Sequence, residues 1–332
     1  MEIDIGFWAA VGFILAAYAV VGNDALQTLG PFINSNRNTP WQVLFAFTAT
    51  VLLVIFFYGY FQNGGDPSFG RLNNVSKYPI FEPKWYHALP PLALFVLTRF
   101  GIPVSTTFMV LSIFATMGGM YSMLTKSLLG YVVAFIAGGV IYAVLAPTLE
   151  RWFLKTHDQQ HAIGWVIFQW AMTAYLWAVW LMQDFANIFV FLPRGLDAAG
   201  GPALNLAEAV LAISVILVLL GITFWNKGGP IQRILQSKTS VDDIRSAAII
   251  NFVFATLLFY FKELNNIPMS TTWVFLGLIA GREFAIATID KVRSTKATAK
   301  IVLSDAFKAF IGLAVSVILA VGLPMVAVAL GG

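Results

Sequence analysis

A short polar motif occurs twice in this sequence, each time inside an apolar stretch. The first copy, Pro-Val-Ser-Thr-Thr, covers 103–107, and the second, Pro-Met-Ser-Thr-Thr, covers 268–272. Proline disfavours helical backbone at the residue before it, and a helix that starts at a serine or threonine cap leaves several N–H groups unpaired. Those N–H groups and hydroxyls could bind an anion, and the alternative is an ordinary capped kink. The candidate anion ligands are Ser105, Thr106, Thr107, Ser270, Thr271 and Thr272.

Two aspartates, Asp24 and Asp184, lie deep inside other apolar stretches. Burying a carboxylate in a membrane is costly, so such a residue is by default a functional-site hypothesis. We expect each helix to unwind there, so that carboxylate and freed carbonyl oxygens can bind Na⁺, a hard cation. Two alternatives stay open: carboxylates that carry protons, and carboxylates that only cap a broken helix. Neutral polar side chains accompany the aspartates: Asn23, Gln27, Gln183 and Asn187.

The two kinds of motif recur in the same order and at nearly the same spacing. Asp184 follows Asp24 by 160 positions, and Ser270 follows Ser105 by 165 positions. Two unrelated motifs repeated in this way predict an internal duplication, a device common in transporters. We therefore expect a first repeat over 1–149, a cytoplasmic connector over 150–161 and a second repeat over 162–332.

The elements that must position these residues are membrane-spanning helices. Of the 332 residues, 59% are hydrophobic and 11% are charged, and the mean hydropathy is +0.79. This composition excludes an ordinary water-soluble enzyme, and the lack of cysteine excludes disulfides and thiolate metal sites. A helix needs about 20 apolar residues to cross a bilayer. We expect an all-α membrane protein with full spans at Ile5–Phe32, Trp41–Phe61, Leu128–Pro147, Ile163–Pro193, Ala203–Trp225 and Ile301–Leu330.

Two further apolar runs, Ala88–Met117 and Ala247–Ala285, are interrupted by Ile-Pro near the middle, and we interpret them as re-entrant hairpins. With the N-terminus outside, twelve Lys and Arg residues fall in the cytoplasm and five fall outside, which obeys the positive-inside rule. Three crossings separate each motif from its copy, so the repeats are expected to be inverted, with both termini outside. The five outer charges are Arg71, Lys77, Lys84, Lys126 and Arg194.

The segments 22–30 (Gly-Asn-Asp-Ala-Leu-Gln-Thr-Leu-Gly) and 183–188 (Gln-Asp-Phe-Ala-Asn-Ile), with the two Pro-X-Ser-Thr-Thr motifs, resemble the PiT-type inorganic phosphate transporter family over nearly the whole chain. The resemblance implies two inverted repeats, each with a broken helix and a re-entrant helical hairpin, around phosphate and its coupling cations. Gln27 and Gln183 stand where the family usually has asparagine, and 48–51 lacks a glutamate common in the family.

The resemblance also implies a set of ligands. Together with the polar positions above, it gives substrate ligands Asp24, Gln27, Ser105, Thr106, Thr107, Asp184, Asn187, Ser270, Thr271 and Thr272. The expected Na⁺ ligands are Asn23, Asp24, Gln183 and Asp184.

We therefore expect a secondary transporter, not an enzyme, that imports inorganic phosphate across the cell (inner) membrane in symport with Na⁺ and needs no cofactor. Coupling to H⁺, and transport of another oxyanion such as sulfate, stay open as alternatives. A membrane enzyme acting on a phosphorylated lipid is disfavoured, because the sequence has no Walker-type loop and no clustered histidines or cysteines. The net charge of +4 fits cytoplasmic loops at a lipid surface rather than nucleic acid. The oligomeric state, a homodimer included, stays open.

Overall fold

The computed structural model describes residues 5–100, 102, 104–145, 148–149, 151–197, 200–227, 243–265, 269–289 and 294–330. Among them, it does not describe the side chains of residues 23–27, 99, 145, 151, 154 and 263. The described residues form helices and connecting segments but no strand, apart from one isolated bridge between Leu196 and Pro202. The expectation of an all-α protein is therefore confirmed for this part of the chain.

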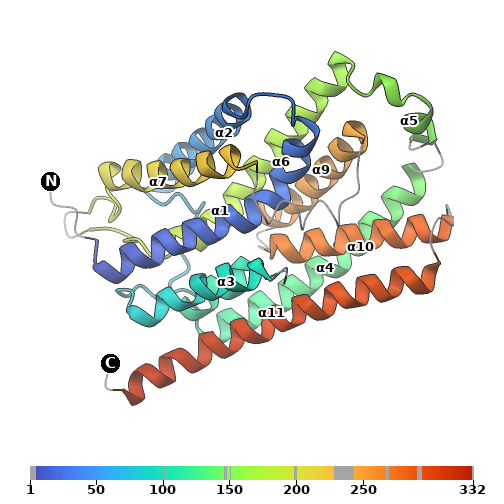
Figure 1. Cartoon of the computed structure of the whole chain (residues 1–332). Helices are drawn as coiled ribbons and strands as arrows, with labels where there is room; N and C mark the ends of the chain where they lie inside the picture. Colours follow the sequence, from blue (N-terminus) through green and yellow to red (C-terminus); the bar gives the residue numbers. More distant parts are fainter. Residues whose placement is uncertain are drawn as a thin grey trace.

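The main helices follow one another along the chain and are joined by short turns and longer segments (Figure 1). They are α1 (Phe7–Ser35), α2 (Trp41–Gln62), α3 (Leu89–Arg99), α4 (Met117–Leu145), α5 (Arg151–Lys155), α6 (Ile163–Phe189), α7 (Leu206–Trp225), α9 (Ile244–Phe259), α10 (Thr271–Ile289) and α11 (Thr295–Ala329). Short 3₁₀ or π-helical turns add to them: η1 (Trp85–Ala88), η2 (Thr107–Leu111), η3 (Ser112–Phe114), η5 (His157–Gln159) and η6 (Tyr260–Leu264).

Seven helices of the described chain are long and apolar enough to cross a membrane, which is typical of a multi-pass membrane protein. They are Trp41–Gln62, Met117–Val144, Ile163–Phe189, Leu206–Trp225, Ile244–Lys262, Thr271–Ile289 and Thr295–Ala329. Large apolar side chains on their outer faces are exposed, for example Val54, Val132, Val218 and Ile318. An exposed apolar belt of this kind suits contact with lipid rather than water.

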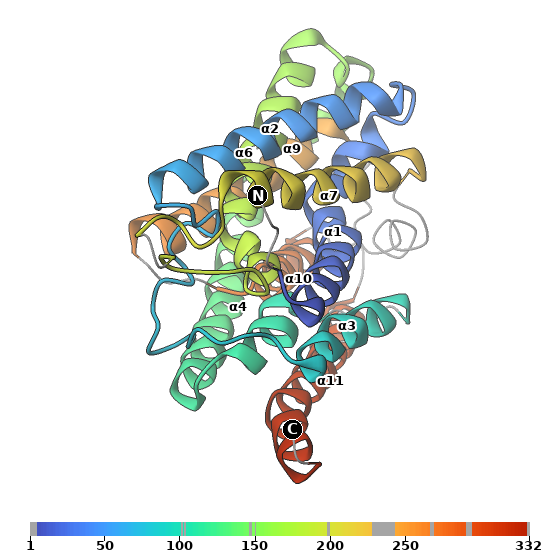
Figure 2. The ribbon, with the colours of Figure 1, turned by 90° about the vertical axis from the view of Figure 1, so that its left-hand side faces the viewer.

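The long helices lie side by side, and both chain termini are at the same end of the molecule (Figure 1). Helix α3 lies toward that end, whereas α9 and α10 extend toward the opposite end. The chain turns back after α3 and again between α9 and α10, so the two Ser-Thr-Thr segments lie inside the molecule. Figure 2 looks onto the end with the termini, where the α2–α3 and α6–α7 segments lie.

Glycines let α4 and α10 approach each other closely. A Cβ atom added at Gly138 of α4 would overlap the backbone of Leu278, and one added at Gly277 or Gly281 of α10 would overlap the backbone of α4. Small residues at a helix contact are the usual way in which membrane helices pack backbone to backbone. This contact fixes α10, which begins at Thr271 in the second Ser-Thr-Thr motif.

The expected breaks in the two acidic helices are not found. Helix α1 runs from Phe7 to Ser35 through positions 23–24, and α6 runs from Ile163 to Phe189 through positions 183–184. A helix satisfies its own backbone hydrogen bonds, so a polar side chain can be held at membrane depth without unwinding it. Breaks were expected at positions 23–24 and 183–184 because a polar pair interrupts the apolar run there.

Two helices begin well before the residue that the sequence predicted as their start. Helix α4 begins at Met117 rather than Leu128, and α11 begins at Thr295 rather than Ile301. The extra turns carry polar residues, among them Lys126 and Lys300, whose long side chains can extend to an aqueous interface while their stems pack on the helix. Polar residues at the end of an apolar run therefore continue the helix instead of ending it.

Candidate functional site

The two Ser-Thr-Thr segments meet inside the protein. The hydroxyl of Ser270 donates a hydrogen bond to the hydroxyl of Ser105 over 2.8 Å, although the two residues are 165 positions apart. Both serines are buried. Each also accepts a hydrogen bond from the backbone N–H three residues on, Phe108 for Ser105 (3.3 Å) and Trp273 for Ser270 (3.4 Å). The two copies of the motif therefore cap their helical turns in the same way and touch each other.

The threonines that follow the serines lie in the same buried region. The Thr272 hydroxyl donates to the backbone oxygen of Val104 over 3.4 Å, which adds a second bond between the two segments. The Thr106 hydroxyl accepts a hydrogen bond from the side-chain amide of Asn187 over 3.2 Å, which connects the first segment to α6. The six predicted hydroxyl residues of the two motifs are all at most 4% exposed. The fold thus brings all six together in its interior.

Helix α6 contributes three polar side chains at this place. Gln183, Asp184 and Asn187 are each at most 1% exposed. Asn187 donates its side-chain amide to Oδ1 of Asp184 over 2.5 Å, one helical turn away, and to the Thr106 hydroxyl over 3.2 Å. Asn187 therefore bridges the carboxylate of α6 to the first Ser-Thr-Thr segment.

Several buried polar atoms of α6 have no hydrogen-bond partner among the described residues. They are Oδ2 of Asp184, both Oε1 and Nε2 of Gln183, and Oδ1 of Asn187. Native proteins leave few buried polar atoms unpaired, because each costs about 1–3 kcal/mol. Four such atoms within two turns of one helix, next to the six buried hydroxyls of the two Ser-Thr-Thr segments, are typical of a site that binds a polar ligand or ions.

Arg71 joins this cluster, and the sequence analysis missed it. The residue is only 8% exposed; its Nη1 donates to the backbone oxygen of Gln183 over 2.5 Å and its Nη2 donates to the Thr107 hydroxyl over 3.3 Å. The sequence predicts Arg71 only as one of five charges outside the membrane, in the segment between α2 and α3. Gly64 and Gly70 have positive φ angles of 61° and 70°, so tight turns flank the path of this segment into the protein.

The oxygens expected to bind Na⁺ are partly occupied in α6. The Gln183 backbone oxygen accepts a hydrogen bond from the Arg71 guanidinium, and one oxygen of the Asp184 carboxylate has no partner among the described residues. In the N-terminal half of the chain, the predicted ligands Asn23, Asp24 and Gln27 lie on α1, but their side chains are outside the described residues. Among the described residues, no group of three or more histidine, cysteine, aspartate or glutamate side chains could hold a metal ion.

A cavity of about 290 Å³ lies at the end of α6, between the segment that carries Arg71 and the α6–α7 connection. Leu72, the neighbour of Arg71, and Phe189 of α6 line it, together with Arg194. Arg194, one of the five predicted outer charges, donates to the backbone oxygens of Tyr78 (3.4 Å) and Pro79 (2.8 Å). Burial, followed by the positive charges of Arg71 and Lys126, lowers the pKa of Lys77 in the same segment to about 8.

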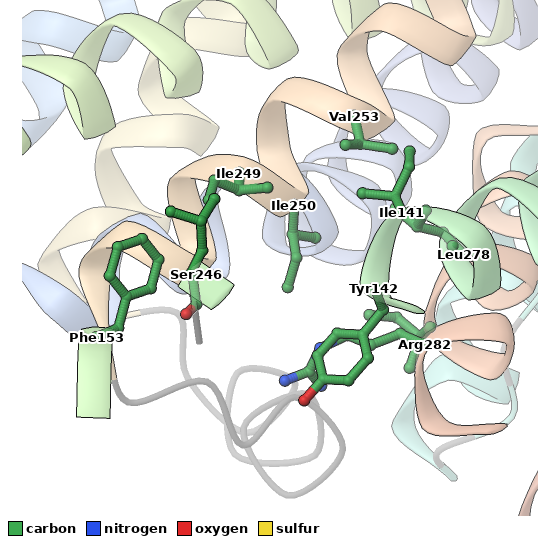
Figure 3. Close-up of a pocket in the computed structure, with 12 residues that line it drawn as sticks. Ile141, Tyr142, Phe153, Ser246, Ile249, Ile250, Val253, Leu278 and Arg282 are labelled. Atoms are coloured by element: carbon green, nitrogen blue, oxygen red, sulfur yellow. The ribbon is translucent and has the colours of Figure 1, made fainter. Parts of the chain in front are cut away.

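A second cavity lies between α4, α9 and α10 (Figure 3). It has a volume of about 40 Å³ and is lined mainly by apolar side chains such as Ile141, Ile250 and Leu278. The Arg282 guanidinium lies 5.4 Å from the centre of the Tyr142 ring and pairs with Glu283 over 3.1 Å. None of the predicted ligands lines this cavity, so it is separate from the site at the hairpin segments.

Comparison with known protein families, with curated proteins and with solved structures finds no match to this chain.

Proposed function

We propose that this protein is a secondary transporter that carries inorganic phosphate across a membrane together with a cation. The observation that carries the proposal is the hydrogen bond between Ser105 and Ser270, which joins the two copies of one motif beside the buried carboxylate of Asp184. Hydroxyls and helix N-termini donate hydrogen bonds to an oxyanion, and the unpaired polar atoms of α6 leave acceptors and donors for the same ligand. The seven apolar helices supply the membrane location.

The arrangement of the hairpin segments supports an inverted repeat. The two serines are 165 positions apart, each caps a helical turn of its own motif, and α3 and the α9–α10 pair lie toward opposite ends of the molecule (Figure 1). In an inverted repeat, two such segments enter from the two sides and meet at the substrate site. We therefore propose repeats over 1–149 and 162–332, in a cell membrane, with both termini outside.

Phosphate is favoured over sulfate by the carboxylate in the site. Near neutral pH, phosphate keeps an O–H group that can donate to the unpaired oxygen of Asp184, whereas sulfate has no proton and meets only like charge. A site that leaves a buried group unpaired with the wrong ligand discriminates strongly. The motif resemblance to PiT-type phosphate transporters points to the same cargo. Na⁺ is the proposed coupling ion, and H⁺ carried on Asp184 is the alternative.

Uptake of radiolabelled phosphate into proteoliposomes tests the proposal. We expect an inward Na⁺ gradient to drive uptake, arsenate to compete because it keeps an O–H group, and sulfate not to compete. The double variant Ser105→Ala/Ser270→Ala should lose most of the uptake, whereas Ser127→Ala, at a buried serine of α4 outside both motifs, should keep it. Uptake driven only by a proton gradient would identify H⁺, and not Na⁺, as the coupling ion. Efficient competition by sulfate would overturn the assignment of phosphate as the cargo. No uptake of any oxyanion under either gradient would overturn the proposal.

A further inference from the structure

Arg71 contributes a buried positive charge to the candidate site, and none of the sequence predictions assigned it a role there. The residue comes from the segment between α2 and α3, at the end of the molecule where both termini lie (Figure 2). Its guanidinium ends between α6 and the first Ser-Thr-Thr segment, where it contacts Gln183 and Thr107. It thus touches both structures that carry the candidate ligands.

Among the described residues, no carboxylate lies close enough to the Arg71 guanidinium to form an ion pair with it. None of the ion pairs among the described residues includes Arg71, and Nε of Arg71 is buried without a hydrogen-bond partner. Its two bonded nitrogens contact a backbone oxygen and a hydroxyl, both uncharged, and the side chain of Tyr78 also interacts with the guanidinium. The charge of Arg71 acts on Asp184, but the two groups do not form a direct ion pair. A buried charge held only by neutral partners is costly unless a ligand of opposite charge binds to it.

A purely structural role would not need this residue type. One hydrogen bond to a carbonyl and one to a hydroxyl could attach the outer segment to α6 with a glutamine, without burying a charge. A guanidinium instead presents five N–H donors in a planar fork that matches the spacing of two oxygens on a tetrahedral oxyanion. The contact with Thr107 places that fork at the end of the first Ser-Thr-Thr segment, where the proposed anion site lies.

We propose that Arg71 binds the transported oxyanion directly and selects for anions that offer it two oxygens. The proposal rests on the proposed function, because it takes the hairpin segments as the anion site. In this arrangement, the hydroxyls of Ser105 and Ser270 and the Arg71 guanidinium hold the anion from different elements, and Asp184 accepts its O–H group.

Further positive side chains lie near Arg71 in the described structure, at the end of the molecule with the termini. Arg194 lines a cavity together with Leu72, which follows Arg71 in the sequence, and Lys77 is close enough to sense the charge of Arg71. Positive charges in a confined opening raise the local concentration of anions. Arg71 is thus the innermost of three cations, Arg194, Lys77 and Arg71, contributed by this end of the protein.

Uptake kinetics of three variants test the proposal, with radiolabelled phosphate and proteoliposomes of the full chain. Arg71→Gln removes the charge and the fork, Arg71→Lys keeps the charge but not the fork, and Arg37→Gln removes one exposed charge from the α1–α2 turn. We expect Arg71→Gln to raise the KM for phosphate by about tenfold or more, Arg71→Lys to raise it by less, and Arg37→Gln to leave it unchanged. Phosphate should raise the Tm of the purified wild-type protein but not that of Arg71→Gln.

The possible results separate this proposal from the proposed function. If the wild type transports phosphate and Arg71→Gln has an unchanged KM with only a lower maximal rate, Arg71 has a structural role and the proposal is overturned. If Arg71→Gln does not fold, Arg71→Lys decides: a raised KM in a folded protein supports direct binding, and a wild-type KM contradicts it. If the wild type neither binds nor transports any oxyanion, the proposed function fails, and direct binding by Arg71 fails with it.

Discussion

At the scale of single residues, Asp184 is the group on which the cation and the anion would both depend. One of its oxygens accepts from Asn187, and the other has no partner among the described residues. An intramembrane carboxylate with a free oxygen can bind a cation, exchange a proton or accept the O–H of phosphate. Each of these roles requires the negative charge or the second acceptor oxygen, which asparagine lacks.

Asp184→Asn is therefore expected to abolish cation-driven uptake, with a loss of roughly a hundredfold, since several kcal/mol of binding depend on the charged group. Asparagine has nearly the same shape, so the protein should stay folded. Initial rates of phosphate uptake as a function of Na⁺ concentration measure the effect, and Asp158→Asn, at an exposed aspartate of the connector, is the control. Full Na⁺ dependence in Asp184→Asn would remove this residue from the coupling mechanism.

A second residue-scale feature is structural. Arg245 is fully buried at the start of α9, where Nη2 lies 2.6 Å from Oδ2 of Asp243 and donates to the backbone oxygen of Phe153 over 2.7 Å. Its guanidinium carbon also lies 4.4 Å from the centre of the Phe153 ring. Unlike Arg71, this arginine has a paired carboxylate, so its charge is neutralised within the protein.

Asp243→Asn should destabilise the protein by about 3–5 kcal/mol, because it leaves a buried guanidinium without its counter-charge. Burial alone would raise the pKa of Asp243, but the hydrogen bonds and positive charge of Arg245 outweigh it and hold the pKa below its usual value. The stabilisation is therefore present above about pH 4 and is lost as the pH falls through the lowered pKa.

Thermal unfolding between pH 3 and pH 7 measures this effect. The Tm of the wild type should fall at the acid end, and Asp243→Asn should start from a lower Tm and show a smaller fall. Equal Tm values for the two proteins at neutral pH would contradict the role assigned to this pair.

The sequence indicated the site residues of the hairpins and α6 because their types are unusual for a membrane interior. Ser105, Ser270 and Asp184 interrupt apolar runs, and the fold brings them together. Arg71 carried no such signal. It lies in a polar segment rich in glycine, where an arginine is ordinarily solvated, and its burial follows only from the tertiary path of that segment between α6 and Thr107.

At the scale of elements, α10 depends on close packing with α4. A Cβ atom on Gly281 would overlap the backbone oxygen of Phe135 and the backbone nitrogen of Gly139. Backbone atoms cannot turn away as a flexible side chain can, so the two helices would have to separate. Such a separation would also move Thr271 and Thr272, which lie at the first turn of α10.

Gly281→Ala is thus expected to cost about 1–3 kcal/mol and to lower uptake, because overpacking shifts helix backbones. Gly322→Ala is a matched control in α11, because a Cβ atom there meets nothing within 4 Å and alanine favours a helix over glycine. The Tm values of the two variants in detergent compare the effects directly. A Gly281→Ala protein as stable and active as Gly322→Ala would show that the α4–α10 contact is looser than described.

Helix positions were largely predictable from the length of the apolar runs, whereas helix continuity was not. The expected span Trp41–Phe61 nearly coincides with α2, and Ala203–Trp225 with α7, because both are uninterrupted apolar runs. The polar positions 183–184 were expected to break α6, but the helix continues through them. Asp184 accepts a hydrogen bond from Asn187 of the same helix, and the Gln183 backbone oxygen accepts one from Arg71, contacts that a single sequence does not show. The second hairpin also differs in form, since α9 and α10 are full-length helices by themselves.

At the scale of the whole molecule, the inverted repeat makes a topological prediction. Between Glu82 and Asp158 the chain forms the first hairpin, which would return to its own side, and α4, which would cross the membrane once. Both residues are exposed, and the sequence has no native cysteine. Glu82→Cys should therefore react with an impermeant thiol reagent only from outside, and Asp158→Cys only from the cytoplasm. Labelling of both from one side would contradict the proposed topology.

The central claim is that one oxyanion binds between the two Ser-Thr-Thr segments and α6. Anomalous X-ray diffraction from crystals of the protein with arsenate tests this claim most directly, because arsenic marks the position of the anion. We predict one arsenic peak within hydrogen-bond reach of the hydroxyls of Ser105 and Ser270 and next to Asp184. An arsenic peak confined to the cavity lined by Arg194, or no peak at a concentration of arsenate that blocks phosphate uptake, would contradict the claim.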